Sequence, residues 1–478
     1  MQDAPGQQRL AASKRDRADL DDQLVEEAGI IKLPGEVAAA HDPDIPARRG
    51  GARIGPVPTR SRTHSGPSRR HRGRGRLGTI PPMPGNVLSV LLAFLKLGCI
   101  SFGGPVAHLG YFHKEFVAKR GWLDEDRYAS IVALCQFLPG PASSQVVFAI
   151  GLLRAGVLGA IAGSVAFMLP SVCVMILAAV GLAQVGDVSK VGWIHGLKLA
   201  AVVVVAQAVW SMGRRLCPDA ARVVLALLAA GVVLIGHSAL LQVAVIALGA
   251  LAGWMIYRRT PIEPGASHKP ESETRRAHAW AATSLVVFAL LLVALPVVVH
   301  FTGSRGLDVV DGFYRSGSVV FGGGHVVLPL LREEVVPPGY ITDDTFLAGY
   351  GVAQAIPGPL FTFAAFLGAS IFPGHPVAGG LSCLAAIFLP AWLLVGGALP
   401  YWERLRHLAP ARSAVMGANA AVVGVLLSAL IDPVLTEAVR TPLDGLAAIV
   451  GLVMLMSLRW PVWVVVLVMA GVGEWGLG

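Results

Sequence analysis

Apolar stretches long enough to cross a membrane recur along the chain from residue 87 onward. A bilayer core about 30 Å thick is crossed by about 20 helical residues, and only helices or closed barrels satisfy their backbone polar groups within lipid. The pattern predicts an all-α polytopic membrane protein with about thirteen transmembrane segments. We place them at 87–107, 128–152, 157–184, 192–212, 219–236, 238–257, 280–302, 308–330, 345–371, 376–401, 413–431, 441–458 and 460–476.

The first 85 residues have a different character, being rich in Arg, Gly, Pro and Asp without a sustained apolar period. Such a composition buries too little apolar surface to offset the entropy of ordering, so residues 1–85 are predicted to be a disordered basic tail. Ten arginines and no acidic residue lie between Arg48 and Arg76. They either hold the tail in the cytoplasm or bind anionic lipid.

Composition supports the membrane assignment, since 54% of the 478 residues are hydrophobic, 14% are charged and the mean hydropathy is +0.63. A net charge of +9 would fit a nucleic-acid partner in a soluble protein, but here basic residues crowd the tail and the short loops. That distribution follows the positive-inside rule, so we predict lipid and no nucleic acid as a partner. The five cysteines have no paired spacing, and neither a metal site nor a cofactor is predicted.

One basic loop conflicts with this topology. If the tail is cytoplasmic, alternation places Arg214, the linker and Arg412 inside as well. The loop that contains Lys114 and Arg120 then falls outside. The segment before it is therefore predicted to be re-entrant or to consist of two shorter helices.

The sequence contains an internal repeat: FLKLGCISFGGPVAH from Phe94 recurs as FYRSGSVVFGGGHVV from Phe313. Six segments and one connecting segment precede the second copy, which predicts that it enters the membrane from the opposite face. Secondary transporters use such inverted repeats to expose a midplane site to each side in turn. The predicted organisation is a tail (1–85), a first repeat (86–257), a cytoplasmic linker (258–279), a connecting helix (280–302) and a second repeat (303–478).

Glycine and proline interrupt four of the predicted segments at matched positions of the two copies. Helices are expected to break there, because proline removes a backbone donor and glycine permits positive φ. Paired breaks in a membrane indicate a binding site, with ordinary proline kinks as the alternative. The candidate substrate-binding residues at the breaks are Phe102, Gly103, Gly104, Pro105, Pro139, Gly140, Pro141, Phe321, Gly322, Gly323, Pro357, Gly358 and Pro359.

After each Pro-Gly-Pro run a helix can restart with free N–H groups and its positive dipole end at the break, which favours an anion. Uncharged side-chain donors align there in the two copies. Their hydroxyl and amide groups can donate to a small oxyanion, although back-bonding of the hydroxyls to their own helix is an equal alternative. These candidate ligands are Gln136, Ser143, Ser144, Gln354 and Thr362.

Two matched cations accompany the breaks. Lys96 and Arg315 share one repeat position, two residues before Gly98 and Gly317. A charge near the midplane costs about 2.5 to 3.5 kcal/mol and usually faces the bundle interior, so both are candidate anion ligands. Lys96 ranks first, since Arg315 lies near the start of its segment and can snorkel to the headgroups.

Acidic and histidine side chains near the breaks are candidates for proton coupling or gating. Glu115 and Glu334 align, and either form salt bridges with the cations, the interpretation we favour, or bind a coupling proton. His108 and His325 follow the Gly-Gly runs without aligning with each other. Each either relays protons or caps a helix, and capping is favoured.

These motifs together resemble the chromate transporter family over most of residues 87–431. The first copy contains SFGGP (101–105), AHLGYF (107–112), CQFLPGPASSQ (135–145) and GLLRAG (151–156), and the second contains VFGGGHVVLPLL (320–331), GYGVAQAIPGPLFTFAA (349–365) and FLPA (388–391). The resemblance implies a long-chain, two-copy secondary transporter that exports chromate across the bacterial inner membrane and so confers resistance. The basic tail departs from that pattern.

Three other functions compete with this interpretation. A permease for sulfate or another tetrahedral oxyanion would need the same donors, and sequence does not separate the two. A membrane-embedded reductase is disfavoured, because the sequence has no Gly-rich nucleotide loop, paired-cysteine motif or metal-ligand cluster. A non-transporting scaffold or sensor is disfavoured by the buried cations and paired breaks. The protein is therefore not expected to be an enzyme, and a homodimer is left open.

Overall fold

A computed structural model describes residues 86–185, 191–236, 238–258, 275–321, 323–405 and 408–476. The predicted tail, most of the predicted linker and Gly322 lie outside these residues. The described part is helical and contains no strand.

In the first repeat the helices are α2 (Val87–Ile100), α3 (Gly104–Phe112) with a π-helical extension (His113–Lys119), α4 (Glu125–Phe137), α5 (Ala142–Ala183), α6 (Gly192–Leu216), α7 (Ala220–Ile235) and α8 (Ala239–Tyr257). Helix α9 (Arg275–Thr302) connects the repeats. In the second repeat they are α10 (Arg305–Val319), η3 (Gly324–Val326), α11 (Val327–Val335), α12 (Asp343–Ala355), η4 (Leu360–Thr362), α13 (Phe363–Ile371), α14 (Pro376–Ala398), η5 (Leu399–Tyr401), α15 (Trp402–Leu405), α16 (Ala409–Ala429), η6 (Leu430–Leu435), α17 (Thr436–Ala438), α18 (Pro442–Met456) and α19 (Val462–Gly476).

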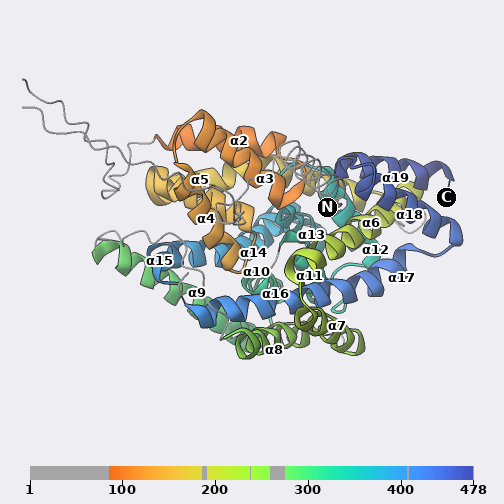
Figure 1. Cartoon of the computed structure of the whole chain (residues 1–478). Coiled ribbons are helices and arrows are strands. Elements are labelled where there is room, and N and C mark those ends of the chain that lie inside the picture. Colours follow the sequence, from red (N-terminus) through yellow and green to blue (C-terminus); the bar gives the residue numbers. More distant parts are fainter. Residues whose placement is uncertain are drawn as a thin grey trace, which may run out of the picture. The chain divides into compact units, whose positions relative to one another are not determined.

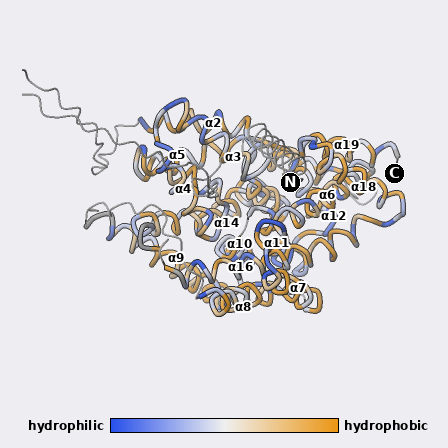
Figure 2. Tube along the Cα trace, viewed as in Figure 1, coloured by the Kyte–Doolittle hydropathy of each residue, from blue (hydrophilic) through white to orange (hydrophobic). Residues whose placement is uncertain are grey.

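The helix surfaces are those of a membrane protein. Six helices of the described part are long and apolar enough to cross a bilayer, and several shorter apolar helices accompany them. Large apolar side chains face outward, such as Leu177, Ile235 and Phe301, which are 70%, 88% and 81% exposed. Figure 2 shows hydrophobic residues along most of α7, α8 and α19. Because water would disfavour such a surface, the described helices are suited to lipid.

Four of the predicted segments are broken, at the runs of glycine and proline. The segment expected at 87–107 divides into α2 and α3, and that at 128–152 divides into α4 and the start of α5. The segments expected at 308–330 and 345–371 divide in the same way, after α10 and after α12. The predicted helix breaks are thus confirmed. A further kink at Ala155 and Gly156 separates the first turns of α5 from its long second part.

Each repeat contributes one long helix that packs on the last helices of the other repeat. Helix α6 lies against α18 and α19, and α16 lies against α7 and α8, as Figure 1 shows for α16. Glycine makes these contacts close. A Cβ atom at Gly196 of α6 would lie 2.1 Å from the Met469 carbonyl oxygen, and one at Gly417 of α16 would lie 2.1 Å from the Gly249 carbonyl oxygen.

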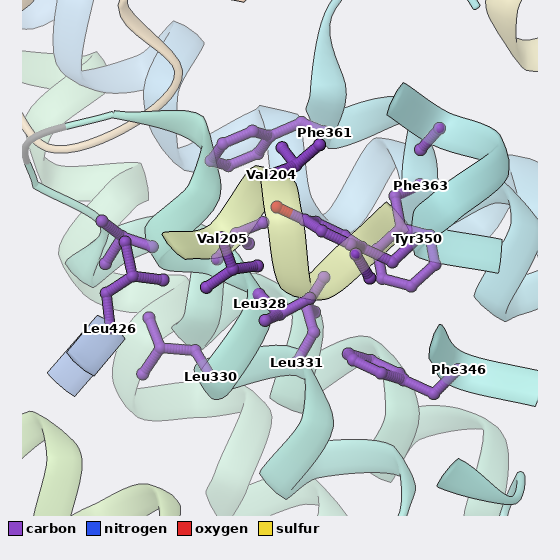
Figure 3. Packing of buried hydrophobic residues seen from close by; sticks show 14 of the residues in the cluster. Val204, Val205, Leu328, Leu330, Leu331, Phe346, Tyr350, Phe361, Phe363 and Leu426 are labelled. Carbon is purple, nitrogen blue, oxygen red and sulfur yellow. The ribbon is translucent and has the colours of Figure 1, made fainter. Parts of the chain in front are cut away.

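The largest buried cluster joins both repeats. In Figure 3, Val204 and Val205 of α6 lie near Leu328 of α11 and Tyr350 of α12. These four side chains are at most 4% exposed. The second-repeat helices that carry the helix breaks are therefore held against a first-repeat helix by apolar packing.

Candidate anion-binding site

Two backbone hydrogen bonds join the helix breaks of one repeat to those of the other. The Gly140 N–H donates to the Val320 carbonyl oxygen at 2.6 Å, and the Gly358 N–H donates to the Ser101 carbonyl oxygen at 2.9 Å. Gly140 and Gly358 occupy equivalent repeat positions, as do Ser101 and Val320. The same bond therefore occurs twice, and it joins the four breaks in two pairs, each of which spans the boundary between the repeats.

Glycine is required at both donor positions. Gly140 has φ of 122° and Gly358 has φ of 111°, a region that side chains other than glycine rarely adopt. A Cβ atom at Gly140 would lie 2.8 Å from the Gln145 side-chain nitrogen and 2.9 Å from the Ala391 Cβ atom. At Gly358 it would lie 2.8 Å from the Ser171 hydroxyl oxygen. The chain is thus closely packed around both donors, and across the repeat boundary.

A helix begins after each break. Helix α3 begins at Gly104 and α5 at Ala142, whereas η3 and η4 lead into α11 and α13. The first N–H groups of a helix have no partner within it, and its N-terminal end carries a partial positive charge. Such an end follows each of the four breaks, which are linked in two pairs, and each end favours a bound anion.

Several polar atoms near the breaks are buried without a hydrogen-bond partner. Among the described residues these include the hydroxyl oxygens of Ser101 and Ser144 and the ring nitrogen His108 Nδ1. Buried polar atoms are normally paired, so the two hydroxyls indicate space for a polar ligand to which they can donate. Ser144 was predicted as a donor from the sequence, whereas Ser101 was missed because its hydroxyl has no repeat counterpart at Val320. The predicted donor Gln354 instead forms a side-chain hydrogen bond with Tyr350.

Thr362, another predicted donor, has a partner within its own helix turn. The Thr362 hydroxyl donates to the Pro359 carbonyl oxygen at 2.8 Å, so back-bonding, the alternative interpretation, describes this residue. Gln136 is exposed, and Ser143 is buried. Gln145, which sequence reasoning did not single out, donates to the Pro139 carbonyl oxygen at 2.7 Å and so fixes the first Pro-Gly-Pro break.

The two histidines have different partners. His108 Nε2 lies 3.1 Å from the Ser101 carbonyl oxygen, at the end of α2, so this side chain caps that helix. His325 Nδ1 lies 2.8 Å from the Tyr350 hydroxyl oxygen, which links η3 to α12. Each contact can form with a neutral imidazole ring, so neither indicates proton transfer. The proton-relay interpretation stays a prediction.

The matched cations lie in matched ion pairs. Lys96 Nζ is 3.7 Å from a Glu115 carboxylate oxygen, and Arg315 is 3.4 Å from the equivalent Glu334. Each pair joins the two arms that flank a break: α2 to the π-helical extension of α3, and α10 to α11. Arg315 also pairs with the buried Asp311 at 2.9 Å, a partner that the sequence did not indicate. Anion binding by Lys96 or Arg315 stays a prediction.

The remaining predicted residues lie within the breaks or next to them. The Phe102 ring lies 6.0 Å from the Trp463 ring of α19, which again joins the two repeats. Gly103, Gly104 and Gly323 have positive φ. Pro105 lies in the first turn of α3. Pro139, Pro141, Phe321, Pro357 and Pro359 flank the breaks, and Gly322 lies outside the described residues.

Comparison with known proteins identifies the class. A family model described as "Chromate transporter" matches residues 88–254 and 307–474, which coincide with the two repeats. With its apolar helices, the chain is therefore a multi-pass membrane protein of a transport family, in which the relatives are transport proteins and not enzymes. It belongs to the chromate transporter family.

The relatives named here are identical to this chain at about a quarter of the aligned positions. It is 27% identical over 375 residues to the chromate transport protein of Pseudomonas aeruginosa, covering 76% of this chain and 84% of the relative. It is 27% identical over 397 residues to the probable chromate transport protein of Synechococcus elongatus, covering 80% and 94%. An uncharacterized transporter of Methanocaldococcus jannaschii is 26% identical over 324 residues, covering 67% and 78%. No solved structure matches the chain.

Proposed function

We propose that the protein exports chromate from the bacterial cytoplasm across the inner membrane by alternating access, and so confers chromate resistance. The observation that carries the proposal is the pair of equivalent backbone bonds, from Gly140 to Val320 and from Gly358 to Ser101. A site built from matching breaks of two repeats, with helix N-termini and free hydroxyls around it, suits an oxyanion. Relatives named as chromate transport proteins support chromate as that anion.

The two repeats have opposite orientations in this proposal. Helix α16 is antiparallel to α8, because Gly417 lies beside Gly253 near the end of α8 and Ala421 lies beside the earlier Gly249. Since α7 precedes α8 and α6 precedes α7 through short turns, α6 runs in the opposite direction to α16. These two helices are equivalent in the repeat, as Gly196 and Gly417 show. Their opposite directions support an inverted repeat.

The four broken segments are proposed to be re-entrant hairpins. The pairs Lys96–Glu115 and Arg315–Glu334 fold the second arm of a hairpin back beside its first. In the described part of the chain nine crossings then remain instead of the thirteen expected, made by the second part of α5 together with α6, α7, α8, α9, α14, α16, α18 and α19.

This topology removes the conflict over the basic loops. With the first segment re-entrant, Lys114 and Arg120 return to the cytoplasmic face together with Arg214 and Arg412. All of these cations then follow the positive-inside rule, which supports a cytoplasmic tail. Because α6 ends at Arg214 and Arg215, its start lies on the outer face.

Ser144→Ala is expected to raise the chromate concentration for half-maximal transport about tenfold or more. The buried Ser144 hydroxyl has no hydrogen-bond partner among the described residues, and a hydrogen bond to a charged group contributes about 1.5 to 3 kcal/mol. Thr362→Val should have a smaller effect, since that hydroxyl already donates to Pro359. Initial rates of chromate uptake into everted vesicles measure both, with Ser428→Ala, whose hydroxyl donates within α16, as the control. An equal effect of the variants at 144 and 362 would contradict this assignment.

Membrane potential alone is expected to drive export. Each charge that crosses is worth about 2.3 kcal/mol per 100 mV, so a dianion leaving a negative interior gains about 4.6 kcal/mol, enough for a gradient above a thousandfold. The test uses proteoliposomes with a potassium diffusion potential, positive inside, and no pH gradient. Chromate accumulation supports the proposal. Accumulation that requires an imposed pH gradient would instead indicate obligatory proton coupling.

A further inference from the structure

We propose that the contact between α6 and α12 closes the outer side of the transport pathway, and that an equivalent contact between α16 and α4 replaces it when the cytoplasmic side closes. The inference rests on the alternating access proposed above. It assigns a gating role to Lys198 and Asp344.

The observation behind it is a difference between the two repeats. Helix α12 of the second repeat packs against α6 and α19 of the bundle. The equivalent first-repeat helix is α4, whose equivalent neighbours would be α16 and α8. In the described part of the chain, α4 makes no extended contact with either of them. One of two equivalent contacts is therefore made and the other is open, as expected for one of two alternating states.

The contact that is made contains buried charge. Lys198 Nζ lies 2.7 Å from a carboxylate oxygen of Asp344, and the Lys198 side chain is 1% exposed. Arg440 lies 3.7 Å from the same carboxylate. One turn earlier on α6, His195 Nε2 lies 2.8 Å from a carboxylate oxygen of Asp444. All five residues lie at or beside the start of α6, which the proposed topology places at the outer face.

The residues equivalent to this contact are present in α4 and α16, but these two helices make no extended contact in the described part of the chain. When the repeats are aligned at Gln136 and Gln354, Asp344 corresponds to Asp126. When they are aligned at Gly196 and Gly417, Lys198 corresponds to Asn419. Asp126 is exposed, and the buried Asn419 Oδ1 has no hydrogen-bond partner in the described residues. An amide in place of the ammonium makes the second contact weaker than the first, because hydrogen bonds between two charged groups are stronger. Without substrate, the protein then favours the state with its outer side closed. In that state the site is accessible from the cytoplasm, as an exporter requires.

Paired cysteines test this exchange directly. A Cβ atom at Gly351 of α12 would lie 3.0 Å from the Leu197 Cβ atom of α6, close to the spacing of about 3.5 to 4.5 Å in disulfides. The repeat equivalents of these positions are the exposed Ala133 and the buried Ala418. Both pairs are introduced into the full chain after replacement of its five native cysteines, and are oxidised with copper phenanthroline in membranes.

We expect each pair alone to form a disulfide, whereas molecules that carry both pairs form one or the other and never both. Mass spectrometry of intact protein and its peptides distinguishes these outcomes. The control is Ser284→Cys of α9 with Gly396→Cys of α14, whose Cβ positions lie 4.0 Å apart and which should form together with either pair. Both gate disulfides in one molecule, or no disulfide between positions 133 and 418, would overturn the proposal.

A charge variant provides a second readout. Asp344→Asn should lower the yield of the 197–351 disulfide and raise that of the 133–418 disulfide at least twofold. Asp343→Asn is the matched control, since Asp343 pairs with Arg332 of the same repeat at 2.7 Å. Unchanged yields for Asp344→Asn, or equal shifts for the two variants, would contradict a gate at Lys198. No chromate is added, because it would oxidise thiols, so this test can fail while the substrate proposal stands, and the reverse.

Discussion

Replacing Gly140 with leucine is expected to abolish chromate export while the protein still reaches the membrane. The backbone at this position has φ of 122°, and a side chain would meet Gln145 and Ala391 at less than 3 Å. Strain of this kind costs about 1 to 3 kcal/mol, and relieving it would pull the Gly140 N–H away from the Val320 carbonyl. The same result is expected for Gly358→Leu, since that donor has φ of 111° and faces Ser171.

Matched variants separate loss of the site from a general effect of the added side chain. Gly231 of α7 has open space around its Cβ position, so Gly231→Leu should transport normally. Chromate uptake into everted vesicles, normalised to the amount of protein in the membrane, gives the comparison. Full transport by Gly140→Leu would contradict a site at the breaks, as would an equal loss in Gly231→Leu.

Arg315→Met is expected to destabilise the protein more than Lys96→Met. Arg315 pairs with both Asp311 and Glu334, and Asp311 is only 2% exposed. Leaving buried carboxylates without their cation costs about 3 kcal/mol. Glu115 instead keeps Arg120 at 2.7 Å when Lys96 is lost, and an exposed pair contributes below about 1 kcal/mol.

Thermal unfolding of detergent-purified protein tests this order. Arg315→Met should show the larger drop in midpoint temperature, and Arg315→Lys should recover part of it, since a lysine retains the charge but not the planar guanidinium. If Lys96→Met unfolds at the same temperature as Arg315→Met, or at a lower one, the ion-pair account of the hairpins is wrong. Transport by both variants shows separately whether either cation also contacts the anion.

Local sequence rules predicted the ends of the helices and the positions of the breaks. Helix α6 begins at Gly192 and α14 at Pro376, as the hydropathy pattern indicates. The breaks at Gly103 and Gly358 follow from glycine and proline, whose backbone preferences act locally. Duplication in the sequence also predicted that equivalent residues would share a role, and Glu115 and Glu334 do pair with equivalent cations.

The sequence did not predict the contacts between the repeats. The pairing of α6 with α19 depends on the close approach of Gly196 to Met469, and nothing in either segment names its partner. The same holds for the bond from Gly358 to Ser101, which joins backbone atoms and leaves no side-chain pattern. Ser144 and Thr362 look equivalent in sequence, yet only the Thr362 hydroxyl is bonded to its own chain, because this choice depends on the local turn.

Radiolabelled chromate uptake into everted membrane vesicles tests the central claim most directly, since their interior corresponds to the outside of the cell. We predict saturable chromate accumulation in vesicles that contain the wild-type protein and none in those that contain Gly140→Leu or Gly358→Leu. Uptake equal to that of vesicles lacking the protein would contradict chromate export. Uptake of labelled sulfate in preference to chromate would assign the same site to a different oxyanion.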